Sequence, residues 1–147
     1  MLKYLRKLLL IAEEFIQRAD MRYLLDTNIV IAYSKRERDI VDKIKSINEI
    51  NISCITLGEV YLGVALSTQK EKNMNEINKF ILDCFVYDID SLTAYHYSLI
   101  KAKTRAMGKP IPDNDLWIAA VAEQHDLIIV TRDKHFLNLD FIKTEIW

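Results

Sequence analysis

Apolar residues recur along the chain in two ways, as short runs and as stripes with three- and four-residue spacing. The runs predict strands over residues 23–25, 50–55, 85–88 and 127–130. The stripes predict helices between and after these strands, the longest over residues 91–107. Strands that alternate with helices favour an α/β fold, in which a parallel β-sheet carries helices on both faces in three layers.

The first 20 residues show a separate amphipathic pattern. Their apolar residues share one helical face, at Leu2, Leu5, Leu9, Ala12 and Ile16. We therefore divide the chain into an N-terminal helical extension, residues 1–20, and a globular domain, residues 21–147. The extension is an upstream misread of the start, a fused partner fragment or a real added helix that packs on the domain or on a second copy. A membrane-surface role is the weaker interpretation, because acids follow its basic end.

Composition and charge narrow the class of protein. A chain of 147 residues with half of them hydrophobic fits one folded domain. Its net charge of -1 provides no global basic field, so binding to nucleic acid requires a local patch or a metal. Cys54 and Cys84 belong to no C-x-x-C pair, which predicts reduced thiols and a cytoplasmic protein. Glu13 and Glu14 interrupt the first apolar run, so we expect neither a secretion signal nor a membrane span.

Four acidic residues stand where a predicted strand ends or a predicted helix begins: Asp26, Glu59, Asp115 and Asp133. Each has a structural explanation when taken alone. Asp26 can cap a helix, and Glu59 can form a capping box with Thr56. Asp115 suits the first turn of a helix, and Asp133 suits a turn. In a parallel sheet, however, all strand-to-helix junctions lie at one edge, so we expect the four side chains to converge.

Four converging carboxylates are unfavourable without a cation. Two carboxylates about 4 Å apart repel by roughly 4 kcal/mol at an effective dielectric constant near 20. A helix dipole stabilises a nearby carboxylate by only about 0.3–1 kcal/mol, which is too little to offset this repulsion. Mg²⁺ or Mn²⁺ would neutralise the cluster, because these hard ions prefer carboxylate oxygens. A bound ion of this kind binds phosphate oxygens and activates water. The pattern therefore predicts phosphodiester hydrolysis, and we interpret His96, His125 and His135 as solvated or packed residues.

Four sequence blocks resemble the signature blocks of PIN domains, in particular those of VapC-type toxins from toxin–antitoxin pairs. The blocks are LDTN at residues 25–28, TLGEV at 56–60, PDNDLWIAA at 112–120 and LIIVTRD at 127–133. The resemblance covers residues 21–147, including the ending TEIW. Residues 1–20 depart from the family pattern, because such toxins usually begin just before the first strand.

The resemblance implies a Mg²⁺- or Mn²⁺-dependent endoribonuclease that acts on RNA. It also implies a homodimer and a cognate antitoxin whose tail covers the active site. Asp26, Glu59 and Asp115 would be the core acids, and Asp133 the more variable fourth acid. Supporting residues would be Thr27 and Asn28, which orient Asp26, Thr131 through its hydroxyl, and Asp113, for which helix capping is the other interpretation. Arg132 and Lys134 adjoin the site and are candidates for RNA contact, although solvated charges explain them equally well.

Two other functions stay open at the level of sequence. The first is a non-catalytic module that binds a partner protein or RNA, against which the intact set of acids argues. The second is a metal-dependent DNA nuclease of related architecture. Site chemistry alone does not separate RNA from DNA, but such DNA enzymes usually need further acids and a longer chain.

Overall fold

The chain folds around one parallel β-sheet. The computed structural model describes the backbone of residues 1–147 and all side chains except those of residues 15 and 17–20. The sheet has the strand order β3-β2-β1-β4-β5, and every neighbouring pair is parallel. Its strands are β1 (Tyr23–Leu25), β2 (Ile50–Ser53), β3 (Cys84–Tyr87), β4 (Ile128–Thr131) and β5 (Thr144–Ile146). The predicted fold is confirmed.

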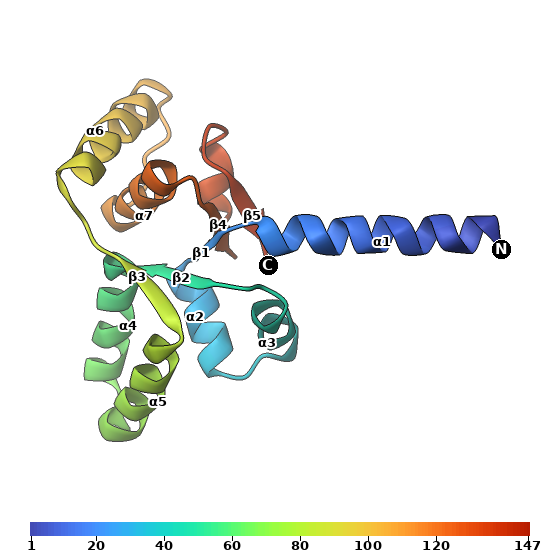
Figure 1. Cartoon of the computed structure of the whole chain (residues 1–147). Coiled ribbons are helices and arrows are strands. Elements are labelled where there is room, and N and C mark those ends of the chain that lie inside the picture. The colour runs from blue at the N-terminus through green and yellow to red at the C-terminus, as the bar shows by residue number, and fades with distance from the viewer.

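Helices cover both faces of this sheet (Figure 1). One face carries α6 (Ser91–Ala106), α7 (Asp113–His125) and the 3₁₀ turn η1 (Lys134–Asn138). The other carries α2 (Thr27–Ser34), α3 (Arg38–Lys45), α4 (Cys54–Leu66) and α5 (Lys70–Leu82). Neither β5 nor η1 was predicted from the sequence.

Alternating side chains of the central strands divide the interior into two cores. On β1, Leu24 faces the α6–α7 side, while Tyr23 and Leu25 face the α2–α5 side. Ile129 and Val130 alternate in the same way on β4. Both strands are therefore buried on both faces, as their continuous apolar runs predict.

Polar caps set helix boundaries that the apolar pattern placed differently. The strand predicted over residues 50–55 ends at Ser53, because the Ser53 hydroxyl accepts the Thr56 N–H at 3.0 Å and starts α4. Glu59 therefore lies well inside α4, and the capping box predicted for it is wrong. Helix α6 is capped by Asp90, which forms a capping box with Thr93.

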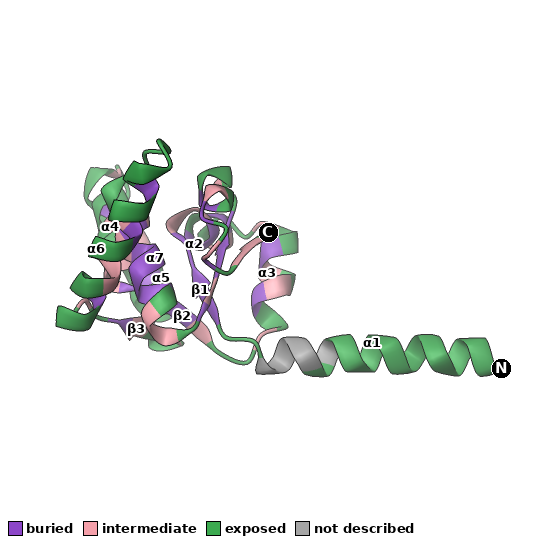
Figure 2. Ribbon diagram, turned by 90° about the horizontal axis from the view of Figure 1, so that it is seen from above, coloured by how far each residue is buried: buried purple, intermediate pink, exposed green. Residues whose placement is uncertain are grey.

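The N-terminal helix α1 (Leu2–Asp20) projects from the domain (Figure 1). Figure 2 shows exposed residues along the part of α1 whose side chains are described. The helix expected over residues 1–20 is thus formed. Among the described residues, no helix is both long and apolar enough to cross a membrane.

Candidate active site

The four predicted acids all lie at the carboxyl edge of the sheet. Asp26 follows β1 and Asp133 follows β4, while Glu59 projects from α4, which starts where β2 ends. Asp115 lies in the first turn of α7. Burial and the negative charges of the other three acids raise the pKa of Asp115, so the four carboxylates share one electrostatic environment.

Asp26 is the most firmly held of the four acids. Its backbone N–H donates to the Val130 carbonyl at 3.0 Å, and its side chain is only 4% exposed. It is the N-cap of α2, since Oδ1 accepts the Thr27 N–H at 2.8 Å. Oδ2 accepts the Thr131 hydroxyl at 2.6 Å and the Asn28 side-chain amide at 3.0 Å. Asp26 is therefore both a helix cap and a member of the acidic cluster.

Asn28 and Thr131 connect α2 to the end of β4. The Asn28 amide donates to the Thr131 hydroxyl oxygen at 3.0 Å, and the Asn28 carbonyl oxygen accepts the Arg132 backbone N–H at 3.0 Å. The Asp133 N–H donates to the same Thr131 oxygen at 2.9 Å. Both residues therefore lie against Asp26, and Thr131 also contacts Asp133.

Glu59 is held between two helices other than its own. The Thr27 hydroxyl of α2 donates to Oε2, and the Asn114 side-chain amide of α7 donates to Oε1 at 2.8 Å. Thr27 thus contacts Glu59 through its side chain and Asp26 through its backbone. The sequence did not predict a role for Asn114. Its position beside Asp115 in the first turn of α7 was the one indication that it lies near the site.

We expect Asn114→Ala to weaken metal-supported cleavage by about tenfold, at the lower end of the range for residues that orient metal ligands. The variant frees Glu59 from α7 while leaving every carboxylate in place. Gln124→Ala is the matched control, because this amide of the same helix also donates to a carboxylate, Asp90 at 3.2 Å, far from the acidic cluster. Equal cleavage rates for both variants would remove Asn114 from the site.

Asp115 has a perturbed pKa. Partial burial, together with the charges of Asp26, Asp133 and Glu59, raises its pKa to about 6. Burial also raises the pKa of Asp26, but hydrogen bonds from Thr131 and Thr27 oppose that increase. The two carboxylates thus differ in support, because hydrogen-bond donors stabilise the charge on Asp26, whereas burial and neighbouring negative charges both disfavour the charged form of Asp115.

Asp133 is paired with His135, an imidazole that we predicted to be a solvated or packed residue. Asp133 caps η1, with Oδ1 accepting the His135 N–H at 2.8 Å and lying 2.9 Å from the His135 Nδ1. Both imidazole and backbone of His135 therefore face this acid. The spacing of an N-cap and the second residue of a short turn was the only sequence indication of the contact.

Asp113 and Arg132 make other contacts than those expected. The Asp113 carboxylate accepts the Tyr97 hydroxyl at 2.9 Å and the Lys101 ammonium at 2.7 Å, which holds its pKa below the usual range. It neither caps α7 nor turns toward the acids.

The two candidates for RNA contact differ in their surroundings. The Arg132 guanidinium pairs with Glu37 at 2.6 Å, which reduces its availability to RNA. Lys134 is exposed.

The donor chemistry fits a hard divalent cation. Four carboxylates supply oxygen ligands, and their mutual repulsion is what a cation relieves. Among the described side chains, however, no three acids, imidazoles or thiols surround a common point. Glu59 is held by Thr27 and Asn114, and Asp133 accepts the backbone N–H of His135.

The parallel sheet with four acids at its carboxyl edge agrees with the comparisons with known proteins. The chain belongs to the PIN-domain family, whose model matches residues 23–142. The ribonuclease VapC2 of Haemophilus influenzae is 34% identical over 130 residues, which cover 86% of this chain and 98% of that protein. The tRNA(fMet)-specific endonuclease VapC of Shigella flexneri is 32% identical over 130 residues, with the same coverage. The predicted resemblance to VapC-type toxins is confirmed.

Solved toxin–antitoxin complexes have the same fold. A DNA-bound VapBC from Salmonella typhimurium matches with a TM-score of 0.81 and 30% identity over 86% of this chain and 98% of that chain. VapBC2 from Rickettsia felis, bound to a promoter DNA fragment, matches with a TM-score of 0.79 and 27% identity, covering 86% of this chain and 99% of that chain.

Proposed function

We propose that the chain is a divalent-metal-dependent endoribonuclease, the toxin of a toxin–antitoxin pair, that acts on RNA in the cytoplasm. The observation that carries this proposal is the placement of four acids from four separate segments of the chain at one edge of the sheet. Its relatives named ribonuclease VapC support RNA as the substrate.

We assign the metal-holding role first to Asp26 and Asp115, with Glu59 and Asp133 completing the site. Mg²⁺ or Mn²⁺, when bound, would supply Lewis-acid chemistry that lowers the pKa of a water and neutralises phosphate oxygens. Thr131 and Asn28 keep the Asp26 carboxylate in one orientation, and Thr27 and Asn114 do the same for Glu59. Because these hydrogen bonds already fix the two carboxylates, the acids could bind the ion without a prior rearrangement of the chain.

Purified full-length protein incubated with single-stranded RNA or DNA of equal sequence tests this function. We expect RNA to be cut in Mn²⁺ or Mg²⁺, EDTA to stop the reaction and DNA to remain intact. Preferential cleavage of DNA would instead favour the DNA nuclease. Absence of cleavage of either polymer by folded protein in metal would favour the non-catalytic binding module.

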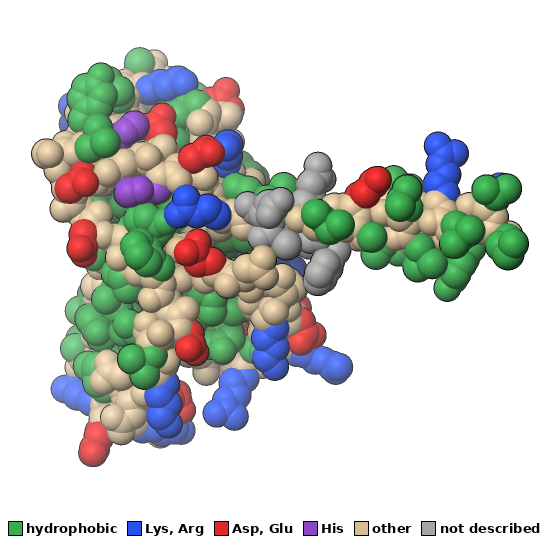
Figure 3. All heavy atoms as spheres, viewed as in Figure 1, with side chains coloured by type: hydrophobic (Ala, Val, Ile, Leu, Met, Phe, Trp, Pro, Cys, Tyr) green, Lys and Arg blue, Asp and Glu red, His purple; other side chains and the backbone are tan. Residues whose placement is uncertain are grey.

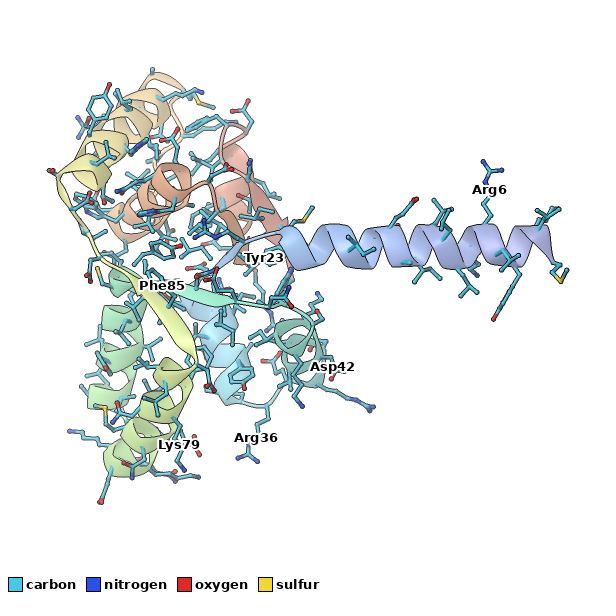
Figure 4. All side chains as sticks on the ribbon, viewed as in Figure 1. Arg6, Tyr23, Arg36, Asp42, Lys79 and Phe85 are labelled. Atoms are coloured by element: carbon cyan, nitrogen blue, oxygen red, sulfur yellow. The ribbon has the colours of Figure 1, made fainter. Side chains whose placement is uncertain are left out.

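Two adjoining grooves support an antitoxin as the protein partner. One, of about 420 Å³, begins at Glu59 and runs between α2, α4 and α5. It shares Ser34, Glu76 and Ile77 with a groove of about 630 Å³ between α2, α3 and α5. The larger groove has an apolar floor and a charged rim that includes Arg36, Asp42 and Lys79, labelled in Figure 4. We assign this path to an antitoxin segment that ends against the acidic site.

An exposed apolar surface supports a homodimer of the domain. Leu62 and Leu66 on α4 and Leu82 at the end of α5 are 59%, 78% and 85% exposed. Phe85 lies on β3, an edge strand whose outer side has no neighbour in the sheet. Exposed apolar side chains and an open edge strand are each typical of an interface, and we assign the homodimer contact to this side of α4, α5 and β3.

A further inference from the structure

Helix α1 has no part in the site or the grooves described above, yet it carries much of the exposed apolar surface. Leu2, Leu5, Leu9 and Ile16 are 86%, 56%, 60% and 63% exposed. Figure 3 shows hydrophobic side chains along much of this helix, away from the domain. A helix of 19 residues is about 28 Å long. An exposed apolar stripe on such a helix indicates a surface that packs on a partner.

The spacing of this stripe specifies the kind of partner. Leu2, Leu5, Leu9, Ala12 and Ile16 alternate in steps of three and four, the repeat of a two-stranded coiled coil. This stripe, the α1 seam, places leucine or isoleucine at each first position of the repeat. Leu8 widens the seam along one flank, and Arg6 and Glu13 occupy the same position of successive repeats along the other. The seam therefore fits one further helix with its own charged flank.

Charge decides the orientation of that helix. Lys3, Arg6 and Lys7 lie near the start of α1, whereas Glu13 and Glu14 lie beyond its middle. A parallel pair of α1 helices would bring like charges together at both ends. Reversing one helix about a twofold axis brings the same flanks together, so Arg6 of each copy faces Glu13 of the other. Opposed helix dipoles favour the same orientation.

We propose that α1 pairs with α1 of a second copy of this chain, in antiparallel orientation, through the α1 seam. The charge complementarity within one helix type argues for a second copy, since no other sequence is needed to satisfy it. A membrane surface fits less well, because Glu13 and Glu14 oppose contact with anionic lipid. This self-association goes beyond the proposed nuclease and uses a surface separate from the edge of β3.

Two neighbouring leucines provide the first test. Leu9 lies in the seam and Leu10 on the outer side of α1, and the two are 60% and 54% exposed. We expect Leu9→Glu to raise the dissociation constant of the association step that runs through α1 by about 100-fold or more, because it buries a charge in the seam, and to leave a dimer through the edge of β3 intact. Leu10→Glu is expected to change it less than about threefold. Analytical ultracentrifugation measures both constants, with far-UV circular dichroism to check that α1 stays helical.

A charge exchange tests the orientation and does not depend on any leucine. Arg6 is exposed and points away from the helix (Figure 4), so it can be replaced without loss of packing. We expect Arg6→Glu or Glu13→Arg alone to weaken association by about tenfold, since each turns two attractive pairs into repulsive ones. The double variant is expected to return to within about threefold of wild type.

Three results would overturn the proposal. The first is a double variant that associates as weakly as the single variants. The second is wild-type protein that associates no better than Leu9→Glu. The third is binding of wild type and Leu10→Glu, but not Leu9→Glu, to phosphatidylcholine–phosphatidylglycerol vesicles, which would assign α1 to a membrane surface.

Discussion

Replacing Asp115 by asparagine is expected to abolish RNA cleavage and at the same time to stabilise the metal-free protein. The loss of activity follows because the substitution removes one of the two carboxylates assigned to hold the metal. We expect it to exceed about 100-fold, the upper end of the range for residues that only orient ligands. The gain in stability follows because burial and the charges of three neighbouring acids both disfavour the charged form of Asp115.

The pH dependence of this effect has a definite sign. A carboxyl group whose pKa is raised in the folded state stabilises the fold fully below its unfolded pKa, 3.8 here, and this contribution is lost as pH rises through about 6. At pH 7 the wild type has lost this contribution to the free energy of unfolding, whereas the stability of Asp115→Asn does not depend on the titration of residue 115. A shift of about two pKa units is worth up to about 3 kcal/mol, and the lost helix-dipole interaction subtracts about 0.3–1 kcal/mol. We expect a net gain of about 1–2 kcal/mol.

Thermal unfolding in EDTA at pH 5 and pH 7 measures this difference. For a chain of this size the gain corresponds to roughly 2–8 °C at pH 7, and it should shrink at pH 5. Asp113→Asn is the matched control, because Asp113 lies in the same helical turn but pairs with Lys101. That variant should keep full cleavage activity. A metal-free Asp115→Asn that is less stable than wild type at pH 7 would contradict the electrostatic account.

Asp26→Asn is expected to abolish cleavage as well, but to destabilise the fold. Three donors point at the Asp26 carboxylate, from the Thr27 backbone, the Asn28 amide and the Thr131 hydroxyl. An asparagine offers one acceptor oxygen and turns an amide group toward a donor. Because the position is buried, each unsatisfied donor costs about 1–3 kcal/mol, which exceeds the gain from removing a desolvated charge. We expect a net loss of about 1–3 kcal/mol.

Denaturant unfolding of Asp26→Asn and Asp115→Asn side by side in EDTA checks the opposite signs. The comparison is internally controlled, since both variants lose one carboxylate from the same cluster. If both variants changed stability in the same direction, the difference in hydrogen-bond support between Asp26 and Asp115 would not be real.

The apolar pattern predicted the parallel sheet because its central strands are buried on both faces. Tyr23–Leu25 and the run over residues 127–130 are continuous in sequence for that reason. The places of Asp26 and Asp133 followed from topology, since parallel strands end at one edge. Glu59 and Asp115 reach the same edge from within α4 and from the start of α7, which follows a helix. Strand β5 escaped prediction because its burial is only intermediate to low, and its pairing with β4 is a long-range contact that no local pattern carries.

Side-chain partners were the part that the sequence did not provide. Asn114 bonds to Glu59 from 55 residues away, and Arg132 pairs with Glu37 from 95 residues away. Neither contact has a periodicity or a motif. Asp113 and Asp115 are equivalent by type and nearly by position, yet the rotation of α7 directs one to Lys101 and the other to the acidic cluster. The different surroundings of these two residues are therefore visible only once α7 is packed in the fold.

A Mn²⁺ titration of purified full-length protein, followed by thermal unfolding, tests the shared metal site most directly. We expect Mn²⁺ to raise the unfolding temperature of wild type and of Asp113→Asn in a saturable manner, because binding to the folded state alone stabilises it. Asp26→Asn and Asp115→Asn should show no such increase. An unchanged unfolding temperature of wild type, or an equal increase in all four proteins, would contradict a metal site at the carboxyl edge of the sheet.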